Sequence, residues 1–235
     1  MKILCTICAR GNSKGLVKKN TKFLKGIPLI CHSIKHAFQS KIFNEIAVTS
    51  DSDEILDLAK KMGITYAVKR PKNLATDSAA KIPVIKHCTL HVEKKSFLHF
   101  DYIIDLDVTA PLRNISDIIE VKSLLVNRGI GNVLSCTPSR KSPYFNLVEV
   151  DQAGIPFLSK TLERNLVRRQ DSPACYDLNG SVYGWERSHL MEEKPLITPD
   201  TRLHIMPSIR GLDIDDELEF KFVEFLMGNT GLLTS

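Results

Sequence analysis

The sequence has no long hydrophobic run: no apolar stretch approaches the ~20 residues that a helix needs to cross a bilayer. We therefore expect no membrane-spanning segment. The apolar start Met1–Ala9 leads directly into Arg10, without a cleavage-site pattern. We interpret it as a buried first strand and expect a cytoplasmic protein.

Acidic residues are absent from the first 41 positions, which carry eight lysines and Arg10. The whole chain has a net charge of only +5, so this basic end is attached to a slightly acidic body. A local basic end favours a small anionic ligand. Aromatic residues are also scarce, with a single Trp, and they are not interleaved with a basic stripe. We therefore expect no nucleic-acid partner.

The six cysteines are scattered through a chain that is too large to be a disulfide scaffold. Cys5 and Cys8 have CxxC spacing, but residues three apart in a strand point to opposite faces. This pattern favours two small core residues in a reducing compartment over a redox or zinc site.

Short β-rich runs alternate with segments of helical periodicity through much of the chain. This alternation predicts one α/β domain over residues 1–235, a three-layer sandwich with a mostly parallel sheet. In such sheets ligands bind beyond the carboxyl ends of the strands. The predicted strands are Lys2–Cys8, Glu45–Thr49, Ile64–Val68, Tyr102–Leu106, Gly131–Cys136, Ser181–Trp185 and Leu203–Met206, and the predicted helices are Pro28–Phe38, Ile55–Met62, Ile82–Val92, Ile115–Val126 and Asp216–Met227.

Residues 137–170 interrupt this alternation. Within them, FNLVEVDQAGIPFL places two β-like runs around Asp151–Gly154, which is a hairpin signal. We predict that this segment projects from the main sheet and is suited to pairing with a second subunit. The alternative is a plain surface hairpin.

The loop Ala9–Asn20 follows the first predicted strand and is basic. Gly11 and Gly15 would let backbone N–H groups approach an anion, and the loop carries Arg10 and three lysines to neutralise it. It matches neither the GxxxxGK[ST] nor the GxGxxG pattern. Its place at a strand end favours a phosphate-binding loop over a solvated basic loop.

A second cluster, RGLDIDDE, lies near the end of the chain. In an extended segment Asp213 and Asp215 project to the same face, where two carboxylates can hold Mg²⁺ whose other ligands are waters and phosphates. Asp216 and Glu217 are suited to the N-terminus of the next helix. The acidic pair alone is a weak signal. Together with the basic loop it favours phosphoryl or nucleotidyl transfer.

Five motifs in order give the chain a resemblance to a known family. They are ARGNSKGLVKKN, KRPKNLATDSA, VTAPLR, RRQDSPACYDLNGSVY and LDIDDELEF, and they span nearly the whole sequence. On these motifs the chain resembles the acylneuraminate cytidylyltransferases, or CMP-sialic acid synthetases, and in particular a CMP-legionaminic acid synthetase-like member.

The resemblance implies a Rossmann-like fold with a projecting segment that makes a homodimer. It also implies a reaction in which CTP and a nine-carbon 3-deoxy-ulosonic acid give CMP-sugar and pyrophosphate with Mg²⁺. By position, the resemblance implies that the catalytic residues are Arg10, Lys19, Asp213 and Asp215, of which Asp213 and Asp215 would bind the metal. The nucleotide would be bound by Arg10, Gly11, Ser13, Lys14, Lys19, Asn20, Arg70 and Ala79. The sugar would be bound by Asp107, Arg169, Gln170, Asp177, Asn179 and Tyr183. The Asn179-Gly180 pair also reads as a tight turn.

Three positions depart from the family pattern, and all three belong to the sugar end. Asp107 stands where the sialic-acid enzymes have a glutamine, and Asp177 stands where they have an arginine. Phe145 stands where the dimerisation segment of those enzymes can bring a lysine toward the neighbouring subunit's sugar. A carboxylate favours hydrogen-bond donors and disfavours a nearby anion. We therefore predict a relative of neuraminic acid with different substituents, such as legionaminic acid. The alternatives are an unchanged N-acetylneuraminate pocket and a role for Asp107 at Mg²⁺ or at the attacking hydroxyl.

Two further functions remain open from the sequence. One is a cytidylyltransferase for an eight-carbon acid such as Kdo, against which the RRQ and DID motifs argue. The other is a non-catalytic nucleotide-binding dimer, against which Lys19 and the acidic pair argue. For the resembled family, the usual destination of the product is a bacterial surface polysaccharide or flagellin.

Overall fold

The computed structural model describes residues 1–12, 15–76, 79–127, 130–162 and 168–229. Its centre is a seven-stranded sheet in the order β11-β7-β10-β6-β1-β4-β5. All neighbouring pairs are parallel except those of β10, which runs antiparallel to both β6 and β7. The strands are β1 (Ile3–Cys8), β4 (Glu45–Ser50), β5 (Tyr66–Lys69), β6 (Tyr102–Leu106), β7 (Asn132–Pro138), β10 (Tyr176–Glu186) and β11 (Thr201–Ile205).

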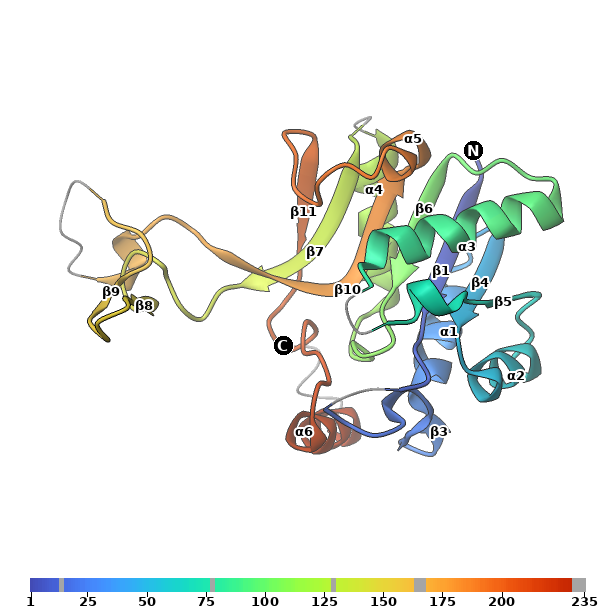
Figure 1. Ribbon diagram of the computed structural model, residues 1–235, viewed down its shortest axis with the longest axis horizontal. Coiled ribbons are helices and arrows are strands. Elements are labelled where there is room, and N and C mark those ends of the chain that lie inside the picture. The colour runs from blue at the N-terminus through green and yellow to red at the C-terminus, as the bar shows by residue number, and fades with distance from the viewer. Residues whose placement is uncertain (13–14, 77–78, 128–129, 163–167, 230–235) are drawn as a thin grey trace.

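Helices cover both faces of the sheet, so the predicted three-layer α/β sandwich is confirmed (Figure 1). One face packs against α1 (Leu29–Ser40), α2 (Asp53–Lys61), α4 (Ile115–Asn127) and α6 (Glu217–Gly228), and the other against α3 (Lys81–Ser96) and α5 (Arg187–Met191). Short 3₁₀ helices are formed by Lys19–Thr21, Lys72–Leu74 and Arg169–Asp171. Within the described ranges, none of the helices has the length and apolar character needed to span a membrane.

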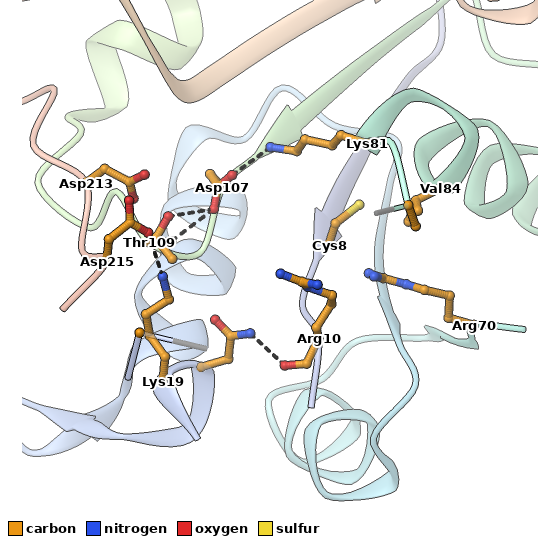
Figure 2. Close-up of a pocket in the computed structure, with 13 residues that line it drawn as sticks. Cys8, Arg10, Lys19, Arg70, Lys81, Val84, Asp107, Thr109, Asp213 and Asp215 are labelled. Atoms are coloured by element: carbon orange, nitrogen blue, oxygen red, sulfur yellow. Dashed lines mark hydrogen bonds and ion pairs between the residues drawn. The ribbon is translucent and has the colours of Figure 1, made fainter. Parts of the chain in front are cut away.

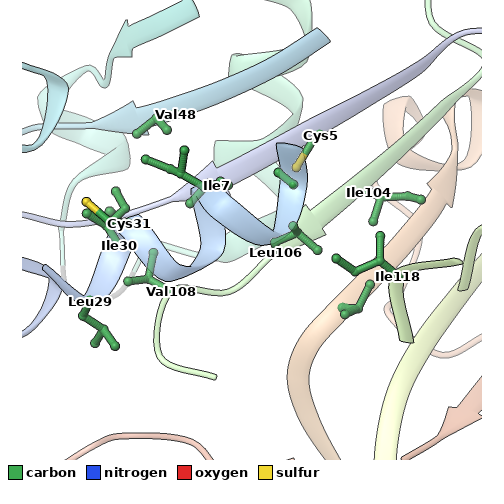
Figure 3. Packing of buried hydrophobic residues seen from close by; sticks show 14 of the residues in the cluster. Cys5, Ile7, Leu29, Ile30, Cys31, Val48, Ile104, Leu106, Val108 and Ile118 are labelled. Atoms are coloured by element: carbon green, nitrogen blue, oxygen red, sulfur yellow. The ribbon is translucent and has the colours of Figure 1, made fainter. Parts of the chain in front are cut away.

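The core follows the two-residue period of the strands. Cys5 and Ile7 on β1 pack toward Leu29 and Ile30 of α1, while Leu4 faces the opposite helical layer (Figure 3). All these side chains are almost fully buried. The continuous apolar pattern of β1 thus results from burial on both faces of the sheet.

An arm projects from the sheet on the extensions of β7 and β10 (Figure 1). At its tip, β8 (Val148–Val150) and β9 (Pro156–Leu158) form the predicted hairpin. The side chain of Asp151 accepts hydrogen bonds from the amides of Ala153 and Ile155, which fixes the turn. The projection is therefore observed, whereas its pairing with a second subunit stays a prediction.

The structure differs from the sequence prediction in four elements. A small hairpin of β2 (Phe23–Leu24) and β3 (Ile27–Pro28) and the short helix α5 were not predicted. The strand expected at Ser181–Trp185 starts earlier, at Tyr176. Its polar middle contains a change of register, with Gly180 at a φ of 65°, so the pair expected to form a tight turn lies at an irregularity within the strand.

Candidate active site

A pocket of about 510 Å³ lies beyond the carboxyl ends of β1 and β6, where ligands of parallel sheets bind (Figure 2). It joins the basic loop of the first 20 residues to the acidic segment near residue 213. Its lining residues are Cys8, Arg10, Gly15, Lys19, Asn20, Arg70, Ala79, Lys81, Val84, Asp107, Thr109, Asp213 and Asp215. We call it the first pocket, and five of the predicted nucleotide residues line it.

The predicted nucleotide residues mostly come together here. Arg10 follows β1, and its carbonyl accepts a hydrogen bond from Asn20 Nδ2 at 2.8 Å, which ties the two ends of the loop together. Arg70 is buried, and its Nη2 donates to the Thr49 carbonyl at 3.0 Å.

Gly11 is placed differently from the other predicted nucleotide residues. Its amide donates to Asp51 Oδ1 at 2.8 Å, so in this structure that N–H is bound to a carboxylate rather than open to an anion. The predictions for Ser13 and Lys14 lie outside the described residues.

The basic loop and the acidic segment are in direct contact. Lys19 Nζ lies 3.1 Å from Asp215 Oδ1 and donates to the Ile214 carbonyl at 2.6 Å. A Cβ atom on Gly15 would lie 2.3 Å from the Asp215 carbonyl oxygen, so this approach requires glycine. Two segments nearly 200 positions apart in sequence therefore form one site.

Asp213 and Asp215 line the same pocket, as expected for alternate residues of an extended segment. Between them Ile214 is fully buried, and its amide donates to the Thr109 carbonyl at 2.9 Å. Asp216 caps α6 in a reciprocal capping box with Glu219, which fixes where the segment ends.

The environment of Asp213 is the main feature that bears on a metal. Burial, with Asp107 and Asp215 nearby, raises the pKa of Asp213 above its usual value. Its Oδ1 atom is buried without a hydrogen-bond partner among the described residues. The described part of the chain has no group of three or more metal-ligating side chains. A carboxylate pair with one open oxygen fits a cation that takes its remaining ligands from water and phosphate.

Lys81 is a pocket residue that the sequence analysis missed. Its Nζ lies 2.8 Å from Asp105 Oδ2 and 2.7 Å from Asp107 Oδ2. Although burial alone would lower the pKa of Lys81, these two carboxylates raise it well above its usual value. The only local signal was a lysine directly before the predicted helix at Ile82, where a cation opposes the helix dipole and is stabilised by acidic partners.

Asp107 lies where two pockets meet. Its Oδ1 atom accepts hydrogen bonds from the amide and hydroxyl of Thr109, at 3.1 and 2.9 Å. Burial would raise the pKa of Asp107, but the ion pair with Lys81 and these hydrogen bonds hold it well below its usual value. Asp107 and Asp213 both also line a second pocket, of about 490 Å³.

The predicted sugar residues do not all share one cavity. Asp177 and Asn179 line the second pocket, whereas Arg169 and Gln170 line a third one, of about 500 Å³, which is formed mainly by residues of the arm. The side-chain oxygen of Asn179 accepts hydrogen bonds from the Ser135 hydroxyl and the Ser181 amide, at 2.6 and 3.1 Å, so it also holds β10 in place.

Tyr183 is 7% exposed and accepts a hydrogen bond from the Gly180 amide at 3.3 Å. Tyr183 therefore lines none of the three pockets, and it reaches the second pocket only through its contact with Gly180, which does line it.

A Rossmann-like sheet with a basic loop and an acidic pair at its carboxyl edge is the arrangement of a nucleotidyltransferase. Residues 4–135 match the cytidylyltransferase family, and the chain belongs to this family. The resemblance inferred from the five motifs is thereby confirmed.

Named relatives cover almost the whole chain. The chain is 41% identical to the CMP-N,N'-diacetyllegionaminic acid synthase of Campylobacter jejuni, over 96% of this chain and 94% of that protein. It is 40% identical to the post-translational flagellin modification protein B of Campylobacter coli, over 98% and 97%. It is 31% identical to the CMP-N,N'-diacetyllegionaminic acid synthase of Legionella pneumophila, over 97% of each chain.

Among solved structures, the chain is similar to a CMP:2-keto-3-deoxy-manno-octonic acid synthetase complexed with CTP. The TM-score is 0.71 at 17% identity, and the match covers 98% of this chain and 100% of that one. At this identity the likeness shows the fold alone.

Proposed function

We propose that this protein transfers CMP from CTP to a nine-carbon, sialic-acid-like 3-deoxy-ulosonic acid and releases pyrophosphate. The observation that carries the proposal is the contact between Lys19 and Asp215, which joins the basic loop and the acidic pair at one pocket. The second pocket adjoins this one at Asp107 and Asp213, so an acceptor bound there would meet the nucleotide at that boundary.

The basic residues are suited to the triphosphate. Arg10, Lys19 and Arg70 line the first pocket and would offset the charge of the phosphates as pyrophosphate leaves. Asn20 and Ala79 line the same pocket and would contact the rest of the nucleotide. On the sequence resemblance, the Gly11, Ser13 and Lys14 part of the loop belongs to the same nucleotide site.

We infer that Asp213 and Asp215 hold a divalent cation, Mg²⁺ by its preference for oxygen ligands. Asp107, Asp213 and Asp215 line the first pocket together, and Asp213 Oδ1 is buried without a hydrogen-bond partner among the described residues. A divalent cation bound there would pair with these carboxylates and stabilise charge on the reacting phosphate.

For the acceptor we propose a legionaminic acid. Support comes from the names of the Campylobacter jejuni and Legionella pneumophila relatives and from the carboxylates Asp107 and Asp177 in the second pocket. The Kdo-type alternative is supported only by a structural neighbour, which shows the fold and not the substrate.

We further propose that the arm pairs two copies of the chain. Arg169 and Gln170 lie on that arm, in a pocket apart from the one lined by Asp177. They would act on an acceptor through the paired arms. The cytoplasmic location and the delivery of the product to a surface glycan or flagellin complete the proposal.

The test is a CTP turnover assay with a panel of sugar acids: N,N'-diacetyllegionaminate, N-acetylneuraminate, pseudaminate and Kdo. We expect pyrophosphate release only when a sugar acid and Mg²⁺ are both present, with the CMP-sugar identified by its mass. We expect kcat/KM to be highest for the legionaminate.

Variants link this activity to the site. Asp215→Asn should reduce kcat by about 100-fold or more, the cost of removing a group that stabilises developing charge. Asp57→Asn, at an exposed helical ion pair, should leave kcat unchanged. CTP binding without turnover of any sugar acid would instead support a non-catalytic nucleotide-binding protein, and a preference for Kdo or N-acetylneuraminate would refute the acceptor proposed here.

A further inference from the structure

Lys81 is a pocket lysine whose role neither the sequence motifs nor the relatives explain. It is the first residue of α3, and its side chain is 34% exposed, with its Nζ between Asp105 and Asp107. The same Nζ lies 6.0 Å from the centre of the Tyr183 ring, within the range of a cation–π contact. Lys81 is thus held by acidic and aromatic groups at the carboxyl edge of the sheet.

The two carboxylates that bind Lys81 face different surroundings. Asp105 is fully buried and accepts a hydrogen bond from the Thr6 hydroxyl at 2.7 Å, so it is enclosed by the fold and lies out of reach of a bound substrate. Asp107 is 28% exposed and lines both the first and the second pocket. Asp107 is therefore the partner through which Lys81 can affect a bound acceptor.

The position of Asp107 is closely fixed. Its carboxylate takes two hydrogen bonds from Thr109 and one contact from Lys81. A carboxylate has about four acceptor sites, so about one is left for a donor in the pocket. Its backbone carbonyl accepts hydrogen bonds from Arg113 and Ser33, which anchor the main chain as well.

Charge gives Lys81 a second effect. The proposed acceptor is an acid, and the charged residues that line the pocket that would receive it are Asp107, Asp177, Asp213, Glu219 and the basic Arg140, so acidic groups outnumber basic ones there. Carboxylates without a positive partner would repel the acceptor's own carboxylate. The ammonium group of Lys81 offsets the charge of Asp107 from the side of the first pocket, while leaving an oxygen of Asp107 at the boundary.

We propose that Lys81 determines acceptor specificity by holding Asp107 in position and balancing its charge, so that Asp107 accepts a hydrogen bond from an N–H or O–H group of the sugar. This inference rests on the proposed function and adds a positioning residue to it. Because an ionised carboxylate only accepts hydrogen bonds, Asp107 selects acceptors that present a donor to it.

The experiment compares the wild type with Lys81→Met, Asp107→Asn and the double variant, using N,N'-diacetyllegionaminate and N-acetylneuraminate. The two acceptors differ in their acylamino groups: N,N'-diacetyllegionaminate carries two, and N-acetylneuraminate carries one. Lys81→Met should raise the KM for the preferred sugar and change the ratio of the two kcat/KM values by about 10- to 100-fold, the effect of one hydrogen bond to a charged group. The KM for CTP should stay within about twofold.

Two controls separate positioning from folding. Lys86→Met removes another lysine of α3, 28% exposed and ion-paired with Glu193, and should leave the acceptor ratio unchanged. Lys81→Met leaves two carboxylates without their lysine partner, which destabilises the fold, whereas the double variant removes one charge of each sign and should fold. If Lys81 acts through Asp107, the double variant should show the same acceptor ratio as Asp107→Asn alone.

The proposal is overturned if Lys81→Met lowers kcat/KM for both sugars by the same factor, or if the double variant differs in acceptor ratio from Asp107→Asn. A wild type that turns over neither sugar with CTP would instead refute the proposed function. The wild-type rates in the same assay therefore distinguish the two failures.

Discussion

Gly15 shows how a single residue lets the two halves of the site meet. Its backbone passes so close to the acidic segment that a Cβ atom would lie 2.3 Å from the Asp215 carbonyl oxygen. Lys19, four residues later, then reaches both that segment's backbone and its carboxylate. The loop is therefore positioned by close backbone packing as well as by charge.

We expect Gly15→Ala to separate the loop from the acidic segment. The clash is with backbone rather than a mobile side chain, so it should cost about 1–3 kcal/mol, the usual range for overpacking. The KM for CTP should rise about tenfold or more because Lys19 moves away from the pocket. CTP titration and thermal unfolding measure the two effects.

Gly26→Ala is the matched control for that prediction. Gly26 has a φ of 82° and no neighbour within 4 Å of an added Cβ, so the substitution adds backbone strain without a clash. It should lower thermal stability and leave the KM for CTP unchanged. Equal KM values for the wild type and Gly15→Ala would contradict the role assigned to this contact.

At the residue scale, the sequence could identify functional side chains where a short segment by itself shows the pattern that the chemistry needs. The glycines and cations of the basic loop and the alternation of Asp213 and Asp215 are of this kind. Lys81 was missed because its partners Asp105 and Asp107 are more than 20 residues away and meet it only when α3 packs across the sheet. Long-range pairing of this sort leaves little local pattern.

At the scale of elements, the acidic segment is held by an anchor on α4. Asp117 is 1% exposed, and its carboxylate accepts hydrogen bonds from Arg210 Nε and Nη2, at 3.2 and 2.9 Å, and contacts His204 Nε2 at 3.1 Å. Arg210 lies only three residues before Asp213. This buried ion pair therefore fixes the start of the segment that lines the pocket.

We expect Asp117→Asn to lower the free energy of unfolding by about 3–5 kcal/mol near pH 7, because it leaves the Arg210 charge poorly compensated. Burial would raise the pKa of Asp117, but hydrogen bonds from His204, the Asn114 amide and Arg210 lower it. Since the folded-state pKa lies below the unfolded one, the ionised group stabilises the fold above pH ~4, and this stabilisation is lost as pH falls through the lowered value.

Urea denaturation between neutral and acidic pH tests this expectation. The difference between the wild type and Asp117→Asn should shrink as the pH falls below ~4. Asp57→Asn, at an ion pair with Lys60 in which both side chains are more than 60% exposed, should change stability by at most about 1 kcal/mol. A difference for Asp117→Asn that stays constant with pH would show that its charge is not what matters.

Elements with a clear period could be predicted, and those set by tertiary contacts could not. The strand Tyr102–Leu106 has both of its predicted ends, and the helix over Ile115–Asn127 begins at the predicted residue. The irregularity at Gly180 resembles a turn in sequence because polar residues and glycine serve both structures. The hairpin of Phe23–Leu24 and Ile27–Pro28 is too short to show a period.

At the scale of the whole molecule, the site connects the two ends of the chain and the arm. The N-terminal loop and the C-terminal segment meet at the first pocket, while β10 carries Asp177 and Asn179 at the second pocket and continues into the arm (Figure 1). Because one strand serves both the proposed acceptor pocket and the arm, a partner bound to the arm would be coupled to the second pocket through the backbone of β10.

The arm carries apolar side chains that the rest of the described chain leaves exposed. Val148, Val150, Ile155 and Phe157 on the tip hairpin are between 48% and 62% exposed. An apolar surface of this kind on a projecting segment is typical of an interface. We therefore expect the protein to sediment as a dimer, with twice the 26.4 kDa mass of one chain.

The double variant Val148→Lys/Val150→Lys should shift the protein to a monomer, because alternate residues of β8 share one face and two buried lysines would be unpaired there. Gln152→Lys, in the exposed hairpin turn, should remain dimeric. Since Arg169 and Gln170 lie on the arm and are proposed to act on the acceptor through the paired arms, the monomeric variant should also show a higher KM for the sugar acid at an unchanged KM for CTP. Analytical ultracentrifugation with steady-state kinetics tests both points, and a wild type that sediments as a monomer at the concentrations of the assay would refute the dimer.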